Sequence, residues 1–340
     1  MSYRSRSSQS VSNWLFLVAL MVCAMILVGG ATRLTDSGLS ITEWKPLSGA
    51  IPPLTAADWQ ASFDLYQQTT EFQEQNSAMT LAEYESIFWW EWAHRQLGRL
   101  IGLVYALPLL VFWLRGSISA HLKPRLLALL GLGALQGGIG WWMVASGLVD
   151  RLDVSQYRLA VHLGMAFLIL GMSVWLGLTA RFGPPPVRQG RLVGPAAALL
   201  VLIFIQILLG AFLAGLDAGR IYNTWPLMNG QLVPEDYLAG MPFLQAIFES
   251  RAAVQMDHRW MGYLVALAVL AFAIAIWREP RVALKPFMIV LPALVIAQIA
   301  LGISALLAVV PLGLSLAHQA GAILLFIATL GATWTARRAM

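Results

Sequence analysis

The chain has a single cysteine and few charged residues. Cys23 lies inside the first apolar run, so the sequence can form neither an intramolecular disulfide nor a cysteine cluster, and iron–sulfur and zinc–thiolate sites are excluded. Charged residues make up 11% of the 340 residues and hydrophobic residues 59%, whereas a soluble domain has about 25% charged residues. This composition indicates a polytopic membrane protein whose surroundings are the lipid bilayer. The net charge of +5 does not indicate nucleic-acid binding, because most positive residues lie in short segments between apolar runs.

Eight apolar runs are long enough to cross a membrane as helices, which need roughly 20 residues each. They cover about residues 14–32, 96–114, 125–147, 158–180, 193–215, 257–277, 286–309 and 315–336. Most Lys and Arg residues, with Glu279 as the only acid, lie in one alternate set of connections, which comprises 1–13, 115–124, 181–192, 278–285 and 337–340. The positive-inside rule therefore predicts that both termini are cytoplasmic.

The connections on the other side, 33–90 and 216–256, are long. We expect a surface helix near 55–72, followed by a capping box at Thr80-Leu81-Ala82-Glu83. The second span is therefore expected to begin as a helix outside the membrane and to run unbroken through Glu91 and His94.

The two halves of the chain repeat each other. Matched positions, in the same order, are Gly30-Ala31 with Gly210-Ala211, Asp36 with Asp217, Trp44 with Trp225, His94-Arg95 with His258-Arg259, Gln136 with Gln298, Gly140 with Gly302, and Ala160-Val161-His162 with Leu316-Ala317-His318. The repeat predicts two tandem four-helix bundles, residues 1-185 and 186-340. Because each copy has an even number of spans, four, both copies enter the membrane from the same side. A pseudo-two-fold axis along the membrane normal then relates them, unlike the inverted repeats of many transporters.

Four of the five histidines lie near the outer ends of the second, fourth, sixth and eighth spans; these are His94, His162, His258 and His318. A lone intramembrane histidine usually makes a helix-to-helix hydrogen bond. Four histidines paired by repeat favour a cofactor instead, because facing histidines at one depth suit the two axial positions of a haem. Zinc and copper are less suitable, since each pair offers two nitrogens with no cysteine nearby.

Each first histidine is followed by an arginine, Arg95 or Arg259. Guanidinium groups pair well with carboxylates, so we predict that these arginines bind haem propionates toward the outer surface. Snorkelling to the membrane interface is the alternative interpretation.

The two copies differ at Glu91, whose match is Gln255. Glu91 and His94 are three residues apart and share a helix face. A carboxylate there can move protons or stabilise positive charge on a substrate. A surface ion pair with Arg95, four residues away, is the alternative. The difference predicts that the first half carries out chemistry with Glu91 as the catalytic group, and that the second half holds a permanent cofactor.

The run Gly29–Pro46, GGATRLTDSGLSITEWKP, together with Glu91-x-x-His94-Arg95 and the three later histidine motifs, closely resembles the haem A synthase family over essentially the whole chain. The long first outer loop without a cysteine pair is similar to the mitochondrial and alphaproteobacterial branch. Bacillus-type members carry two cysteines in that loop, so their thiol–disulfide chemistry is not implied for this chain.

The resemblance implies a substrate, haem O, whose C8 methyl group is oxidised through an alcohol and a hydrated aldehyde to the formyl group of haem A for cytochrome oxidase. It also implies that His94 and His162 bind the substrate haem iron, that His258 and His318 bind haem b iron, and that Glu91 is catalytic. Two axial histidines leave no open position for dioxygen. Either one histidine of the first pair leaves during turnover, or oxidation proceeds without oxygen binding to that iron.

The same resemblance implies a bacterial inner-membrane location with the haem sites toward the periplasm. The implied partners are a haem O synthase, cytochrome oxidase assembly factors and an electron donor.

A di-haem transmembrane cytochrome b that oxidises a quinol shares the four histidines but does not explain the Glu91/Gln255 difference. A transporter is disfavoured by the parallel repeat. The Gly-rich stretch 137–140 allows close helix packing, either within the chain or in a homo-oligomer.

Overall fold

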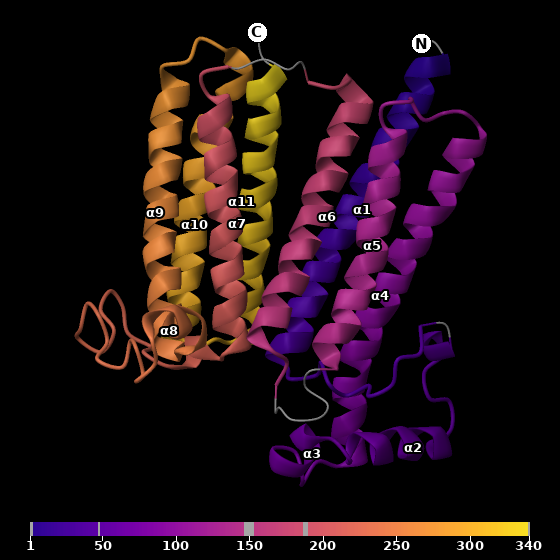
Figure 1. Cartoon of the computed structure of the whole chain (residues 1–340), viewed down its shortest axis with the longest axis vertical. Coiled ribbons are helices and arrows are strands. Elements are labelled where there is room, and N and C mark those ends of the chain that lie inside the picture. Colours follow the sequence, from indigo (N-terminus) through magenta and orange to yellow (C-terminus); the bar gives the residue numbers. More distant parts are fainter. Residues whose placement is uncertain (1–2, 47, 146–152, 186–189, 339–340) are drawn as a thin grey trace. The chain divides into compact units, whose positions relative to one another are not determined.

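The computed structural model describes residues 3–46, 48–145, 153–185 and 190–338; over these ranges the regular structure is helical apart from one bridge between Met228 and Gln231. Eight helices of this described part are long and apolar enough to cross a membrane, as the sequence predicts. They are α1 (Tyr3–Leu34), α4 (Leu81–Leu114), α5 (Lys123–Val144), α6 (Gln156–Phe182), α7 (Val193–Gly215), α9 (Arg251–Trp277), α10 (Phe287–Leu307) and α11 (Leu312–Arg338), as Figure 1 shows. The predicted end of the third run at 147 lies outside the described residues, and the expected boundary between 185 and 186 lies at the edge of an undescribed stretch.

The connections carry the short elements. These are η1 (Ser48–Ala50), α2 (Ala56–Tyr66), α3 (Thr70–Glu74), η2 (Ala218–Arg220), α8 (Phe243–Glu249) and η3 (Val282–Leu284). The surface helix expected near 55–72 is two helices, because Thr69 interrupts it. Its hydroxyl donates to the carbonyl of Tyr66 at 2.7 Å and accepts from the amide of Phe72 at 3.2 Å, which caps the start of α3.

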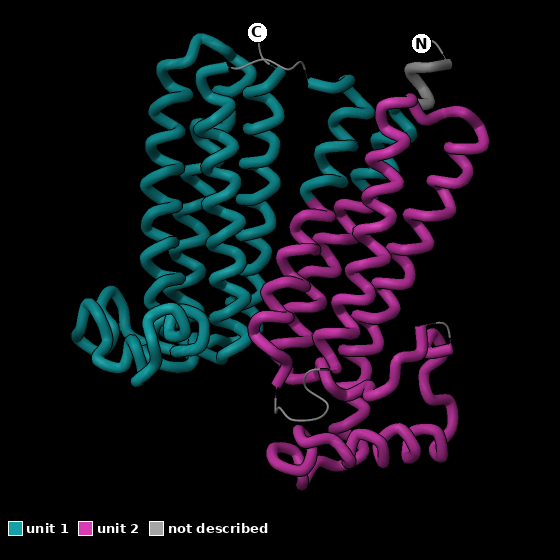
Figure 2. Tube along the Cα trace, viewed as in Figure 1, with its two compact units in different colours: residues 1–16, 171–340 teal, residues 17–170 magenta. Residues whose placement is uncertain are grey.

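The chain divides into two compact units: unit 1 comprises residues 1–16 and 171–340, and unit 2 comprises residues 17–170 (Figure 2). In unit 1, α7 packs against α9 and α11, and α10 also packs against α9 and α11, so these four helices form a closed bundle. The end of α6 joins them, since the rings of Phe182 and Trp334 on α11 lie 5.5 Å apart.

Helix α4 is the longest element of unit 2 and begins at the predicted capping box. The amide of Thr80 donates to the carboxylate of Glu83 at 2.8 Å, and the hydroxyl of Thr80 accepts from the amide of Glu83 at 3.4 Å. The helix runs unbroken from Leu81 to Leu114, through Glu91 and His94, as expected. Buried aromatic side chains pack α2 and α3 onto its first turns; they are Phe63, Tyr66, Phe72, Tyr84 and Phe88.

The backbone turns in the same way after α1 and after α7. Asp36 has a φ of 48° and Asp217 a φ of 49°, a left-handed conformation that Asp tolerates better than most residues. The two aspartates are 181 positions apart, the offset that also relates Trp44 to Trp225. Each turn starts the loop that follows its helix, and the two loops have the same spacing relative to the turn.

Candidate functional site

Two imidazole rings lie close together, edge to face, within unit 1. His258 lies on α9 and His318 on α11, with ring centroids 6.5 Å apart and ring planes at 71°. A bond between a metal and an imidazole nitrogen is about 2 Å long, so two rings bonded in line to one metal have centroids roughly 6 Å apart. The observed separation therefore leaves room for a metal between the rings.

A glycine of a neighbouring helix lies against each of these rings. A Cβ atom added to Gly210 on α7 would lie 3.3 Å from Cε1 of His258, and one added to Gly302 on α10 would lie 2.8 Å from Cε1 of His318. The absence of side chains on these glycines leaves the room that the imidazoles occupy. Packing at this distance restricts where each ring can lie.

Glutamines also contact both histidines. Gln206 Nε2 on α7 donates to the backbone oxygen of His258 at 3.0 Å, and Gln298 Nε2 on α10 donates to that of His318 at 2.8 Å. Nδ1 of His318 lies 3.1 Å from the backbone oxygen of Gln298. A carbonyl oxygen can only accept, so Nδ1 carries the proton, and Nε2 is left as the metal-binding nitrogen.

Unit 2 repeats the glycine packing. A Cβ atom added to Gly29 on α1 would lie 3.1 Å from Cε1 of His94, and one added to Gly140 on α5 would lie 3.0 Å from Cε1 of His162. Gln136 Nε2 donates to the backbone oxygen of His162 at 3.1 Å, as Gln298 does for His318.

The position of Gly29 corrects the alignment of the two copies. The sequence comparison pairs Gly30 with Gly210, but the residue of α1 that lies against a histidine is Gly29. Gly29 and Gly210 are 181 positions apart, the offset of the aspartate turns that follow. A shift of one residue rotates a helical position by about 100°, so Gly30 faces a different direction from Gly210.

The arginines anchor the loop that follows the aspartate turn in each unit. Arg95 donates to the backbone oxygens of Ile41 at 2.7 Å and Glu43 at 2.9 Å. Arg259 donates to the oxygens at the matching positions, Tyr222 at 2.8 Å and Thr224 at 3.0 Å. Both guanidinium groups therefore hold the loop beside the neighbouring histidine, a contact that the sequence alone does not reveal.

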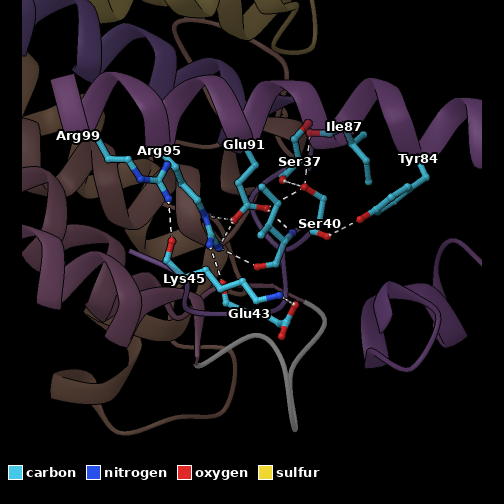
Figure 3. Close-up of polar contacts among 10 residues, drawn as sticks. Ser37, Ser40, Glu43, Lys45, Tyr84, Ile87, Glu91, Arg95 and Arg99 are labelled. Carbon is cyan, nitrogen blue, oxygen red and sulfur yellow. Dashed lines mark hydrogen bonds and ion pairs between the residues drawn. The ribbon is translucent and has the colours of Figure 1, made fainter. Parts of the chain in front are cut away.

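Glu91 is buried, with 3% of its surface exposed, and its carboxylate is enclosed by donors (Figure 3). Oε2 accepts from the hydroxyl of Ser40 at 2.8 Å and from the amide of Ile41 at 2.7 Å. Oε1 accepts from Arg95 Nε at 3.0 Å and Nη2 at 2.6 Å. The ion pair with Arg95 is thus present, but it lies in the interior rather than on the surface. Arg99, one turn further along α4, binds the next loop carbonyls at Lys45 and Pro46.

Gln255 occupies the matching place in unit 1 and accepts from its arginine as Glu91 does, but toward its loop it donates instead of accepting. Its Nε2 donates to the carbonyls of Ala218, at 2.8 Å, and Ile221, and its Oε1 accepts from Arg259 Nη2 at 3.1 Å. The loop of unit 2 offers donors to Glu91, whereas the loop of unit 1 offers acceptors to Gln255. Each side chain therefore suits its own loop: the donors of the unit 2 loop suit a carboxylate, and the carbonyls of the unit 1 loop suit the amide of a glutamine.

Glu71, on α3 outside the membrane-spanning segments, is a buried acid that the sequence does not single out. It is 3% exposed, and its Oε2 has no hydrogen-bond partner in the part of the chain that the structure describes. Burial, then the charges of Asp36, Asp153 and Glu91, raise the pKa of Glu71 from 4.5 to about 8. Between these values the folded chain holds a proton that the unfolded chain releases, so the contribution of Glu71 to stability falls as the pH rises.

The eight apolar helices define a polytopic α-helical membrane protein, and in each unit two histidines pack against glycines of neighbouring helices. A sequence model of the COX15-CtaA family, described as cytochrome oxidase assembly protein, matches residues 12–330. The Heme A synthase of Maricaulis maris is 73% identical over 338 residues, which cover 99% of both chains. The Heme A synthase of Rhizobium johnstonii is 51% identical over 330 residues, or 96% of this chain and 89% of that protein. That of Caulobacter vibrioides is 48% identical over 339 residues, or 98% of each. The chain belongs to the haem A synthase family of cytochrome oxidase assembly proteins.

Proposed function

We propose that the chain is an oxidoreductase that converts haem O into haem A by oxidising the C8 methyl group to a formyl group. Formally, the methyl carbon loses four electrons and gains one oxygen atom. The support is the family membership together with the paired histidines, each packed against a glycine of a neighbouring helix. The opposed rings of His258 and His318 carry the most weight, because their 6.5 Å separation suits two axial ligands of one iron.

The residues at both pairs fit a haem better than a bare metal ion. Among the described residues, no group of three or more His, Cys, Asp and Glu side chains is placed to hold a metal ion. A bare zinc ion needs three or four protein ligands. A haem brings four equatorial nitrogens of its own and needs only the two axial imidazoles that each pair supplies.

We assign haem b to unit 1, where His258 and His318 would hold its iron. When bound, this haem supplies one-electron transfer. The hydrogen bond from Nδ1 of His318 to Gln298 orients the ring and favours Nε2 as the ligand atom. Nε of Arg259 is buried and has no hydrogen-bond partner among the described residues, so it is available to a propionate carboxylate.

We assign the substrate haem to unit 2, with His94 and His162 as the residues that hold its iron. Arg95 is the matching candidate for a propionate, although its contacts with Glu91 and the loop carbonyls already occupy much of its guanidinium. In this assignment His94, on α4, would hold the substrate haem on the same helix as Glu91.

We assign the catalytic role to Glu91. Its carboxylate is held by Ser40, Ile41 and Arg95, so it has a fixed position one helical turn from His94. A fixed carboxylate stabilises positive charge that develops on the substrate, or accepts a proton from it, without reorganising first. Gln255 in unit 1 has no negative charge to offer, which agrees with a permanent cofactor there.

The two functional halves in this proposal are residues 1-185 and 186-340, related by the parallel repeat. We place the protein in a bacterial inner membrane with both termini in the cytoplasm and the haem sites toward the periplasm, from the distribution of Lys and Arg. The partners are a haem O synthase, an electron donor, and cytochrome oxidase assembly factors.

Pigment analysis of the purified protein tests the proposal. Haem is extracted and separated by chromatography from cells with and without a co-expressed haem O synthase. Haem A or its hydroxylated precursor, together with haem b, is the expected result when the synthase is present. Haem b alone at two per chain would instead support a di-haem electron-transfer cytochrome b.

A further inference from the structure

The glutamine contact described above is missing at one histidine. Gln136, Gln206 and Gln298 donate to the backbone oxygens of His162, His258 and His318, respectively. No hydrogen bond reaches the imidazole of His94 from any residue that the structure describes. The matching position, 181 residues before Gln206, is Met25.

Met25 and Gln206 occupy the same place in their units. Each lies four residues before the glycine that packs against the histidine, so it is on the same helix face one turn away. A Cβ atom added to Gly98 would lie 3.3 Å from Cε of Met25, and one added to the matching Gly262 would lie 3.5 Å from Nε2 of Gln206. The two side chains therefore reach the same point on the facing helix, but only Gln206 can donate a hydrogen bond there.

The chemical consequence follows from the two side chains. Gln206 Nε2 lies 3.2 Å from Nδ1 and 3.3 Å from Nε2 of His258, in addition to its bond to the backbone. Once Nε2 of His258 binds a metal, Nδ1 carries the proton and neither ring nitrogen can accept, so the restraint comes from the bond of Gln206 to the backbone oxygen of His258, which anchors that turn of α9. A methionine is flexible, and its thioether cannot donate, so Met25 fills the space without anchoring the turn of α4 that carries His94.

We propose that His94 is the releasable axial ligand of the substrate haem, and that Met25 is the positioning residue that makes it so. The inference rests on the proposed function and decides which histidine of the first pair leaves. On release, the bond between the iron and the His94 nitrogen breaks, the electron pair stays on the imidazole, and nothing is oxidised or reduced. His162 keeps its glutamine and holds the iron on the other side.

Carbon monoxide binding to the reduced, haem-loaded protein measures this directly, because a six-coordinate iron binds carbon monoxide only after a protein ligand leaves. The wild-type protein is expected to bind carbon monoxide at the haem of unit 2 and not at haem b. Their absorption bands differ when the former carries a formyl group. Met25→Gln supplies the missing donor and should slow binding at the unit 2 haem about tenfold, the factor that one hydrogen bond of about 1.4 kcal/mol represents.

Two further variants control the experiment. Met25→Leu stays apolar and should bind carbon monoxide as the wild type does. Gln206→Met gives unit 1 the residue of unit 2 and should make haem b reactive. If Met25→Gln binds carbon monoxide as fast as the wild type, or if Met25→Leu slows it equally, the assignment is wrong. If Met25→Gln does not load haem, Gln206→Met still tests the inference. Haem b that does not bind carbon monoxide in Gln206→Met would also overturn it. A protein that contains only haem b fails the proposed function, which the pigment analysis detects separately.

Discussion

Gly302→Ala is the sharpest test that the histidine pair of unit 1 holds a haem. The added methyl group would lie 2.8 Å from Cε1 of His318, well inside van der Waals contact, and 3.3 Å from Nδ1. The ring cannot simply move away, because its Nδ1 is hydrogen-bonded to Gln298 O at 3.1 Å. The substitution therefore forces a choice between a steric clash and a lost hydrogen bond.

The structure sets the size of the effect. Overpacking of this kind costs about 1–3 kcal/mol, and the hydrogen bond contributes about 0.5–1.5 kcal/mol. Because the substitution incurs one cost or the other and each 1.4 kcal/mol is a factor of ten, haem b affinity should fall roughly twofold to 150-fold. The matching change Gly210→Ala places its methyl group 3.3 Å from the His258 ring, a contact that a small shift relieves, so its effect should be smaller.

The assay is haem b content per chain, together with the low-spin spectrum of the purified protein. Gly313→Ala is the matched control, because it lies on the same helix as His318 and its added Cβ would meet nothing within 4 Å. Gly302→Ala should lose haem b while Gly313→Ala retains it. Equal haem b content and an unchanged spectrum in both variants would refute the steric argument.

Further substitutions test the other roles. Glu91→Gln should keep haem bound yet stop its conversion to haem A. Ser40→Ala removes one hydrogen-bond donor to Glu91 but keeps the carboxylate, so it should retain most haem A formation. Normal haem A output from Glu91→Gln would contradict a catalytic role. Removal of either imidazole in His258→Ala or His318→Ala should abolish the haem b spectrum, and an unchanged spectrum would exclude that residue as a ligand. Glu71→Gln stays neutral at every pH, so it should raise the thermal unfolding temperature at pH 8 and have no effect below about pH 4.5. Between those values, each pH unit should change the difference in unfolding free energy between Glu71→Gln and the wild type by up to about 1.4 kcal/mol. A difference that does not vary with pH would show that the pKa of Glu71 is not raised.

Much of the fold could be predicted because membrane spans are a local property. A helix in a bilayer must satisfy its own backbone, so a long apolar run is sufficient to identify it. The unbroken course of α4 was also predictable, since the capping box at Thr80 is a local signal. The break between α2 and α3 was not predictable, because it depends on the hydroxyl of Thr69, which donates to Tyr66 at the end of α2 and accepts from Phe72 in α3.

The sequence by itself determined the eight apolar helices, the tandem repeat, the four histidines and the difference between Glu91 and Gln255. Only the tertiary structure decided which partners these side chains take. It showed that Gly29 rather than Gly30 lies against His94, and that Arg95 and Arg259 bind loop carbonyls. It also showed that Met25 takes the place at which Gln206 donates a hydrogen bond to the backbone of His258. The physical reason is that hydropathy and spacing are carried by the chain itself, whereas a hydrogen bond or a close packing contact depends on how each helix is rotated against its neighbour.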